Sequence, residues 1–434
     1  MSRHELPRLL LCASASGSGK TTFTTGLLRV LYNKGIKAQP FKCGPDYIDP
    51  QFHTQAAHRP SVNLDSWLAS MPHLQTVYSK YGADAEVLVT EGVMGLFDGY
   101  NKWLGSSAQL SSSLNIPVIL LVNARSTAFS VAPLIYGFKH FNPDVRIAGV
   151  VFNQVASESH FRYLREACEA TETPCFGYLP RLKELEVPSR HLGLTLDQEF
   201  ERERWIGRVA EAIEASIDID SLLDHCPADL PEPVEETKPA DGTLRMAVAR
   251  DEAFNFIYRE NIASLKRLGQ VLYFSPLKDH HLPERIDLLY LPGGYPEFFL
   301  PELEANRSLK EEITQFAREG GRVLAECGGM MYLCREIIDP AGGHHPMCGV
   351  LPLTATMEGM RLHLGYRQFE YNGHAWRGHE FHYSNIVGDH PSAAALFDAK
   401  GKASATPLYR QENVIAGYTH LYWGDQNPLN LWES

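Results

Sequence analysis

The sequence lacks the features that mark several specialised classes of protein. Its eight cysteines form no CxxC pair, which argues against a structural zinc site and favours buried thiols in a reducing compartment. No run of about 18 apolar residues is present, so we expect no transmembrane helix. The net charge of −12 gives no general reason to expect nucleic-acid binding. The short N-terminal apolar run does not fit a signal peptide, so these absences predict a cytoplasmic protein without nucleic-acid or membrane partners.

The chain also lacks internal repeats, and its one biased stretch is rich in proline and acidic residues. A length of 434 residues with 44% hydrophobic residues indicates a globular protein of two or three domains. The biased stretch has no apolar periodicity, which is typical of a linker. We therefore predict a first domain over residues 1–226, a linker over 227–243 and a second domain over 244–434.

Short apolar runs alternate with helical patterns in both predicted domains. This alternation predicts the α/β class, with a parallel sheet covered by helices on both faces. In the first domain the predicted strands are 9–13, 38–43, 86–90, 117–123, 147–153 and 175–179, and the predicted helices are 21–33, 126–139, 158–170 and 197–217. In the second domain the predicted strands are 244–249, 271–274, 287–291 and 322–325, the predicted helices are 255–268 and 301–318, and the pattern becomes more β-like after about residue 340.

Residues 13–22, with the sequence ASASGSGKTT, connect the first predicted strand to the first predicted helix. This context predicts a phosphate-binding loop, because small residues let backbone N–H groups surround an anion at a helix N-terminus. Lys20 would reach the terminal phosphates of a nucleoside triphosphate, and the Thr21 hydroxyl would ligate Mg²⁺. A plain Gly/Ser turn is the alternative. The loop has Ser14 where glycine is usual, and Ala15 where partition-type ATPases carry an extra lysine.

Phosphoryl transfer needs Mg²⁺, and therefore carboxylates beside such a loop. Glu91 directly follows a buried strand, as a Walker-B-type acid would. Turn stabilisation and helix capping are the alternative roles for the acids of this region. The candidates at strand ends are Glu91 and Asp98, then the group Lys42, Asp46 and Asp49, and finally Asn153, which would contact the nucleotide base or act as a cap.

Cys327 in the second predicted domain follows a strand and opens a glycine-rich turn before a helix. This arrangement is typical of a nucleophile elbow, and the helix N-terminus is expected to lower the pKa of the thiol. Backbone N–H groups of Gly293 and Gly294 would form an oxyanion hole. His420 would deprotonate Cys327. A buried structural thiol is the alternative, and it is the role that we expect for Cys334.

The motifs around these residues resemble the cobyrinate a,c-diamide synthase family over essentially the whole chain. In that family the N-terminal domain is similar to dethiobiotin synthetase, and the C-terminal domain is similar to a class I glutamine amidotransferase. The motifs that carry the resemblance are ASASGSGKTT (13–22), FKCGPDYIDPQFH (41–53), TEGVMGLFDGY (90–100), VPSRHLGL (187–194), LPGGYPE (291–297), AECGGMMYL (325–333) and GYTHLYW (417–423).

The resemblance implies a ligase with two sites, which uses ATP and glutamine to amidate a corrinoid tetrapyrrole in cobalamin biosynthesis. Cys327 would release ammonia from glutamine, with His420 as general base and acid. ATP would phosphorylate the a and c side-chain carboxylates of cobyrinate, and ammonia would displace the phosphate. By position, ATP would be held by Gly17, Ser18, Gly19, Lys20, Thr21 and Thr22, Mg²⁺ by Thr21, Asp46 and Glu91, and the reacting carboxylate would lie near Lys42, Asp49 and Asp98.

The sequence departs from triad amidotransferases after the histidine, where Tyr422 replaces the usual glutamate. The partner of His420 would then be a backbone group, a water or an acid from elsewhere, such as Asp425, and a Cys–His dyad is favoured. Two rival interpretations remain. One is amidation of hydrogenobyrinate or nickel sirohydrochlorin, and the other is a regulatory P-loop ATPase whose second domain only binds a partner. Ala15 and the elbow at Cys327 argue against the ATPase.

Overall fold

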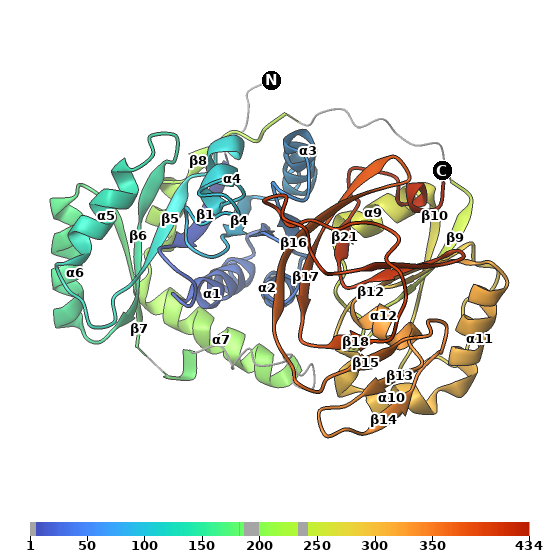
Figure 1. The fold of residues 1–434 in the computed structure, drawn as a ribbon. Helices are drawn as coiled ribbons and strands as arrows, with labels where there is room; N and C mark the ends of the chain where they lie inside the picture. The colour runs from blue at the N-terminus through green and yellow to red at the C-terminus, as the bar shows by residue number, and fades with distance from the viewer. Residues whose placement is uncertain (1–5, 182, 186–198, 233–241, 434) are drawn as a thin grey trace. The chain divides into compact units, whose positions relative to one another are not determined.

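The chain folds into two compact units, and the computed structural model describes residues 6–181, 183–185, 199–232 and 242–433 (Figure 1). Unit 1 comprises Met1–Glu236 and unit 2 comprises Thr237–Ser434. The start of the predicted linker belongs to the first sheet, because strand β8 (Pro227–Ala228) pairs antiparallel with the beginning of strand β1 (Leu6–Ala13). The 187–194 motif, the helix start predicted at residue 197 and linker residues 233–241 lie outside the described residues.

The sheet of unit 1 is parallel apart from β8, and its strands run in the order β3-β2-β4-β1-β5-β6-β7. Strands β2 to β4 lie on one side of β1, and β5 to β7 lie on the other side. The strand order therefore reverses at β1, and ligands of such sheets bind beyond the carboxyl ends of the strands at this point. The further strands are β2 (Ala38–Cys43), β3 (Val62–Leu64), β4 (Val87–Glu91), β5 (Val118–Asn123), β6 (Ile147–Val155) and β7 (Cys175–Pro180).

Helices cover both faces of this sheet, as predicted from its continuous apolar strands. On β5, Ile119 and Leu121 join the hydrophobic core beneath α1, α2 and α7, whereas Leu120 and Val122 join the core beneath α5 and α6. Within the described ranges, no helix combines the length and the apolar character needed to cross a membrane. The helices are α1 (Lys20–Asn33), α2 (Asp49–Ala57), α3 (Met71–Gly82), α4 (Ser107–Leu114), α5 (Val131–His140), α6 (Glu158–Ala170), α7 (Glu199–Ser216) and α8 (Ile219–Asp224).

The main sheet of unit 2 has the order β10-β9-β11-β12-β20-β19, and only its β19–β20 pair is antiparallel. Its strands are β9 (Leu244–Ala249), β10 (Gly269–Phe274), β11 (Leu288–Leu291), β12 (Arg322–Glu326), β19 (Leu408–Gln411) and β20 (Val414–Gly417), and its helices are α9 (Arg259–Leu268), α10 (Leu300–Ala305), α11 (Arg307–Arg318) and α12 (Gly328–Leu333). Two smaller sheets contain β13 (Glu336–Ile338), β14 (His344–Pro346), β15 (Thr354–Thr356) and β18 (Asn385–Val387), and then β16 (His363–Tyr371), β17 (His374–His382) and β21 (His420–Tyr422).

Three predicted helices differ from those in the structure by more than two residues at one end or are divided. The helix predicted over 301–318 is divided into α10 and α11 at Asn306. The buried Asn306 amide donates hydrogen bonds of 2.8 Å to the carbonyl groups of Pro276 and Asp279. These bonds to another loop are not visible in local periodicity, and side chains of this kind compete with helical backbone. The helices predicted from residues 126 and 255 begin later, at Val131 and Arg259.

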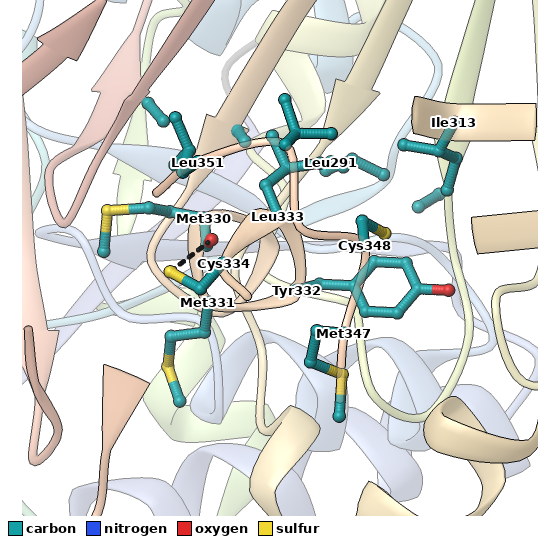
Figure 2. Close-up of a cluster of buried hydrophobic side chains, with 14 of the residues drawn as sticks. Leu291, Ile313, Met330, Met331, Tyr332, Leu333, Cys334, Met347, Cys348 and Leu351 are labelled. Carbon is teal, nitrogen blue, oxygen red and sulfur yellow. Dashed lines mark hydrogen bonds between the residues drawn. The ribbon is translucent and has the colours of Figure 1, made fainter. Parts of the chain in front are cut away.

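The core of unit 2 surrounds the short helix α12 (Figure 2). Met330, Leu333 and Cys334 are fully buried there, and they pack with Leu291 and Ile313 from other elements. The Cys334 thiol donates a hydrogen bond of 3.4 Å to the Met330 carbonyl group. The prediction that Cys334 is a core residue is therefore confirmed.

Candidate active sites

The first candidate site is a cavity of about 530 Å³ at the carboxyl ends of the unit 1 strands. Two predicted site residues, Ser18 and Asp98, are not among those that line it. Ser18 Oγ donates to the Ala15 carbonyl group at 2.9 Å, and Asp98 Oδ2 accepts from Gly95 N at 3.0 Å, so each side chain bonds within its own loop. The other predicted residues of this unit all line the cavity, namely Gly17, Gly19, Lys20, Thr21, Thr22, Lys42, Asp46, Asp49, Glu91 and Asn153.

The glycine-rich loop before α1 is shaped by a close approach at Gly19. Its φ is 98°, and a Cβ added there would lie 2.1 Å from Asn153 Nδ2. Asn153 Nδ2 donates to the Ser18 carbonyl group at 2.8 Å, and Asn153 Oδ1 accepts from Gln154 N at 2.8 Å. Both ends of the Asn153 amide are thus engaged by backbone. This geometry favours support of the loop over contact with a nucleotide base.

Lys20 is the first residue of α1, and its ammonium group turns back over the loop. Lys20 Nζ donates to the carbonyl groups of Ala15 at 3.1 Å and Met94 at 2.6 Å. Burial lowers the pKa of Lys20 from its ordinary value. Phosphate oxygens would be charged acceptors for this ammonium, and charge-assisted hydrogen bonds are stronger than those to neutral carbonyl groups.

Two acids and a lysine form a buried ion-pair network beside the loop. Lys42 Nζ lies 2.7 Å from both Asp49 Oδ2 and Glu91 Oε1, and Thr21 Oγ1 donates to Glu91 Oε1 at 3.0 Å. Burial acts to lower the pKa of Lys42, but the nearby carboxylates of Asp49 and Glu91 outweigh burial and raise it. Lys42, predicted to face the substrate, therefore lines the cavity as a charged partner of these acids.

Asp46, predicted to bind Mg²⁺, also fixes the start of α2. Its Oδ1 atom accepts from Ile48 N at 2.7 Å and from Asp49 N at 3.1 Å. Burial acts to raise the pKa of Asp46, but Lys42 and these backbone donors hold it below its ordinary value. In the described part of the chain, no three His, Cys, Asp or Glu side chains form a complete metal cage. The adjacent oxygens of Thr21 and Glu91 fit Mg²⁺ chemistry, because this ion usually takes one or two protein ligands with phosphate oxygens and waters.

His53 is a residue of this site to which the sequence analysis assigned no role. It is fully buried, and its Nε2 atom lies 2.7 Å from Glu91 Oε2. It lies on α2 four residues after Asp49, so the two side chains share one face of the helix. No helix is predicted between residues 43 and 86, so this helical spacing is not evident from the sequence. Pro50 at the first turn of α2 was the available signal for a helix start.

The second candidate site is the turn at Cys327 between β12 and α12. Cys327 has φ 47° and ψ −107°, an uncommon conformation for a residue with a side chain. Its N–H group donates to the Gly417 carbonyl group at 2.7 Å, which ties the turn to the neighbouring strand β20. This strained connection of strand to helix is the geometry of a nucleophile elbow, as predicted.

The expected lowering of the Cys327 pKa is not found. Burial raises the pKa of the thiol well above its ordinary value, and the nearby carboxyl groups of Glu297 and Glu326 act in the same direction. Helix α12 comprises six residues, Gly328–Leu333. Desolvation of a thiolate therefore outweighs the effect of this short helix and favours the neutral thiol.

His420 lies against the glycine pair predicted as an oxyanion hole. A Cβ added to Gly293 would lie 2.1 Å from His420 Cε1, so only glycine allows this contact. A Cβ added to Gly328 would lie 3.2 Å from Gly294 N, which places that amide beside the residue after Cys327. The structure thus brings the predicted histidine, glycine pair and elbow into one region of unit 2.

Burial lowers the pKa of His420 to about 3, and His379 and His382 add to this effect. Burial therefore favours the neutral imidazole near pH 7 and makes it a weaker base than a solvent-exposed histidine. The predicted alternative partner, Asp425, is exposed, whereas His420 is fully buried. The His382 ring stacks on Tyr418, two residues before His420, with ring centroids 3.5 Å apart.

The Glu326 side chain connects the elbow at Cys327 to strand β21, which contains His420. Its Oε1 atom accepts from Leu421 N at 3.0 Å, and its Oε2 atom is 2.8 Å from the Tyr290 hydroxyl group. Glu326 directly precedes Cys327, and Leu421 directly follows His420. A single hydrogen bond therefore joins the residue before Cys327 to the residue after His420.

Burial raises the pKa of Glu326 from 4.5 to about 8. From this shift we predict how the free energy of unfolding depends on pH. The folded protein binds a proton that the unfolded chain has released, so Glu326 should destabilise the fold progressively as pH rises from about 4.5 to about 8. A Glu326→Gln variant cannot ionise. We expect its unfolding midpoint, relative to wild type, to be higher at pH 8 than at pH 5. Thermal unfolding of both proteins across this range tests the prediction, and an offset that does not change with pH would contradict it.

Comparisons with known proteins cover both units. The CobQ/CobB/MinD/ParA nucleotide-binding domain matches residues 9–194, and the CobB/CobQ-like glutamine amidotransferase domain matches residues 245–428. Cobyrinate a,c-diamide synthase of Dehalococcoides mccartyi is 39% identical, covering 98% of this chain and 96% of that protein. The enzyme of the same name from Priestia megaterium is 37% identical, covering 97% and 95%. Hydrogenobyrinate a,c-diamide synthase of Brucella melitensis is 41% identical, covering 95% and 97%.

Proposed function

Because this chain belongs to the family of cobyrinate and hydrogenobyrinate a,c-diamide synthases, we propose that it amidates the a and c side-chain carboxylates of cobyrinate in cobalamin biosynthesis. It is then a carbon–nitrogen ligase that hydrolyses glutamine and ATP. The observation that carries the proposal is the presence of two different sites in one chain. One is a glycine-rich cavity with Lys20 and Glu91, and the other is an elbow with Cys327 near the His420 strand.

The cavity of unit 1 supports activation of the carboxylate. Backbone N–H groups of Gly17 and Gly19 and the Lys20 ammonium would hold the phosphates of ATP. Thr21, Glu91 and Asp46 would hold Mg²⁺, which neutralises charge on the phosphate oxygens. A substrate carboxylate oxygen attacks the γ-phosphorus atom, and ADP leaves. The resulting acyl phosphate replaces hydroxide, a poor leaving group, with phosphate. Ammonia then attacks the acyl carbon, and phosphate departs.

The elbow of unit 2 supports the supply of ammonia. His420 takes the proton of the Cys327 thiol as sulfur attacks the amide carbon of glutamine. The Gly294 N–H group would stabilise the oxyanion. His420 returns the proton to the leaving nitrogen, and ammonia is released. Water then hydrolyses the thioester to give glutamate and to restore the thiol.

The proposal includes a cytoplasmic location and small-molecule partners alone, namely the corrinoid, glutamine and ATP. The absence of a membrane-spanning helix among the described residues and the net charge of −12 are compatible with this. Hydrogenobyrinate is the second candidate substrate, because relatives that bear its name are as similar to this chain as those named for cobyrinate.

A panel of tetrapyrrole acids tests the substrate. The full-length protein would receive ATP, Mg²⁺ and glutamine labelled with ¹⁵N in its amide, with cobyrinate, hydrogenobyrinate or nickel sirohydrochlorin. We expect mass spectrometry to show two labelled amides on cobyrinate, with one phosphate released for each amide. Preference for a different macrocycle would show that this macrocycle, and not cobyrinate, is the substrate. Glutamate and phosphate release without a labelled product on any macrocycle would contradict the ligase.

A further inference from the structure

Four side chains from three elements form a continuous chain of polar contacts beside the glycine-rich loop. Asp49 and His53 stand one helical turn apart on α2, Lys42 is on β2, and Glu91 ends β4. Asp49 bonds Lys42 at 2.7 Å, Lys42 bonds Glu91 Oε1 at 2.7 Å, and His53 bonds Glu91 Oε2 at 2.7 Å. Lys42 and Glu91 are also paired neighbours in the sheet. Two side chains of helix α2 therefore contact the Lys42–Glu91 ion pair, Asp49 at the lysine and His53 at the carboxylate.

We propose that His53 is a positioning residue that holds the Glu91 carboxylate in the orientation needed to bind Mg²⁺ with ATP. The inference rests on the proposed function, which assigns Glu91 and Thr21 to this ion. His53 does not line the cavity, so it acts through Glu91 and does not contact the substrates.

The direction of the hydrogen bond follows from the chemistry of the two groups. An ionised carboxylate only accepts hydrogen bonds, so the His53 Nε2 atom carries the hydrogen and donates it. The Lys42 ammonium pairs with Glu91 Oε1 at 2.7 Å, and the same oxygen accepts from the Thr21 hydroxyl group, as expected of an ionised carboxylate. On the other side of the His53 imidazole, Ser61 Oγ lies 3.4 Å from Nδ1. His53 is fully buried, so water cannot easily replace the donor.

The two Glu91 oxygens have different partners, and this difference shows what the hydrogen bond from His53 does. Oε1 accepts from the Thr21 hydroxyl group and from Lys42, and it is the oxygen on the side of the nucleotide loop. Oε2 is held by His53. Without that anchor the carboxylate could rotate and bind Lys42 with both oxygens, which would turn charge away from the cation. Partners that orient a metal ligand in this way typically contribute about 10- to 100-fold in metal affinity or activity.

Binding of Mg²⁺ with a non-hydrolysable ATP analogue tests the proposal without relying on turnover. Calorimetry on the full-length protein would measure the Mg²⁺ concentration required for half-maximal binding of the analogue. In the His53→Leu variant we expect this concentration to rise by about 10- to 100-fold. His53→Gln should restore most of the affinity, because the glutamine amide can place a donor near the former Nε2 atom. His53→Asn is too short to reach Glu91 and should resemble His53→Leu.

The Ser61→Ala variant is the matched control, because it removes the partner at Nδ1 of the His53 imidazole and leaves the bond from Nε2 to Glu91 in place. We expect wild-type Mg²⁺ dependence for this control. Wild-type dependence in both His53→Leu and His53→Asn would overturn the inference, as would a His53→Gln variant as weak as His53→Asn. The Gln and Asn pair decides the matter even if the leucine variant does not fold. Absence of Mg²⁺-dependent nucleotide binding in the wild type would instead overturn the proposed function itself.

Discussion

Replacing Cys327 with alanine is expected to reduce glutamate release from glutamine by on the order of 10⁴-fold or more, because the reaction loses its nucleophile. The side chain stands on a strained turn at the end of β12, in the region of the His420 strand. The same variant should still amidate the macrocycle when it is given free ammonia. The carboxylate is activated in the separate cavity around Lys20, which the substitution does not touch. Assays of glutamate and of amidated product, with each nitrogen source, measure both effects.

Cys334→Ala provides the matched control, since it removes another fully buried thiol at the far end of α12. We expect it to lower the free energy of unfolding by about 1–2 kcal/mol and to leave glutaminase activity in place. Unchanged glutamate release in Cys327→Ala would refute the amidotransferase site. Loss of its ammonia-dependent activity, in a protein that is still folded, would refute the separation into two sites.

Replacing Lys20 with alanine is expected to lower ATP-dependent amidation by on the order of 10³-fold, whether the nitrogen comes from glutamine or from ammonia. The Lys20 ammonium is buried at the first residue of α1, and burial lowers its pKa. In such an environment a charge stabilises the transferred phosphoryl group more strongly than it would in water. Release of phosphate and formation of the amide should fall together.

The control for this variant is Lys34→Ala, which removes an exposed lysine directly after the last residue of the same helix. It changes the net charge by the same amount, and we expect activity close to that of wild type. Comparable circular dichroism spectra of the two variants would exclude unfolding as the cause of a loss. Retention of amidation by Lys20→Ala with either nitrogen source would remove the assignment of the loop to ATP.

The elements that the sequence predicted best are those defined by short-range patterns. Strands β2 and β9 and helix α6 have the predicted bounds, because unbroken apolar runs and helical periodicity are local signals. Helix α2 was missed because its nine residues carry a weak apolar pattern beside a run of turn formers. The division between α10 and α11 was missed because Asn306 bonds carbonyl groups of a loop about 30 residues earlier in the chain. Such partners are set by tertiary structure, so no local pattern contains them.

The sequence by itself determined the α/β class. Motifs of a few residues also identified Lys20, Cys327 and His420 as candidate site residues. Only the tertiary structure decided how these groups are charged and oriented. It raised the pKa of the Cys327 thiol where a helix N-terminus was expected to lower it. It also placed His53 on Glu91, which lies 38 residues further along the chain. The physical reason is common to both cases: desolvation and hydrogen bonding depend on what surrounds a group in space, and those neighbours come from distant parts of the chain.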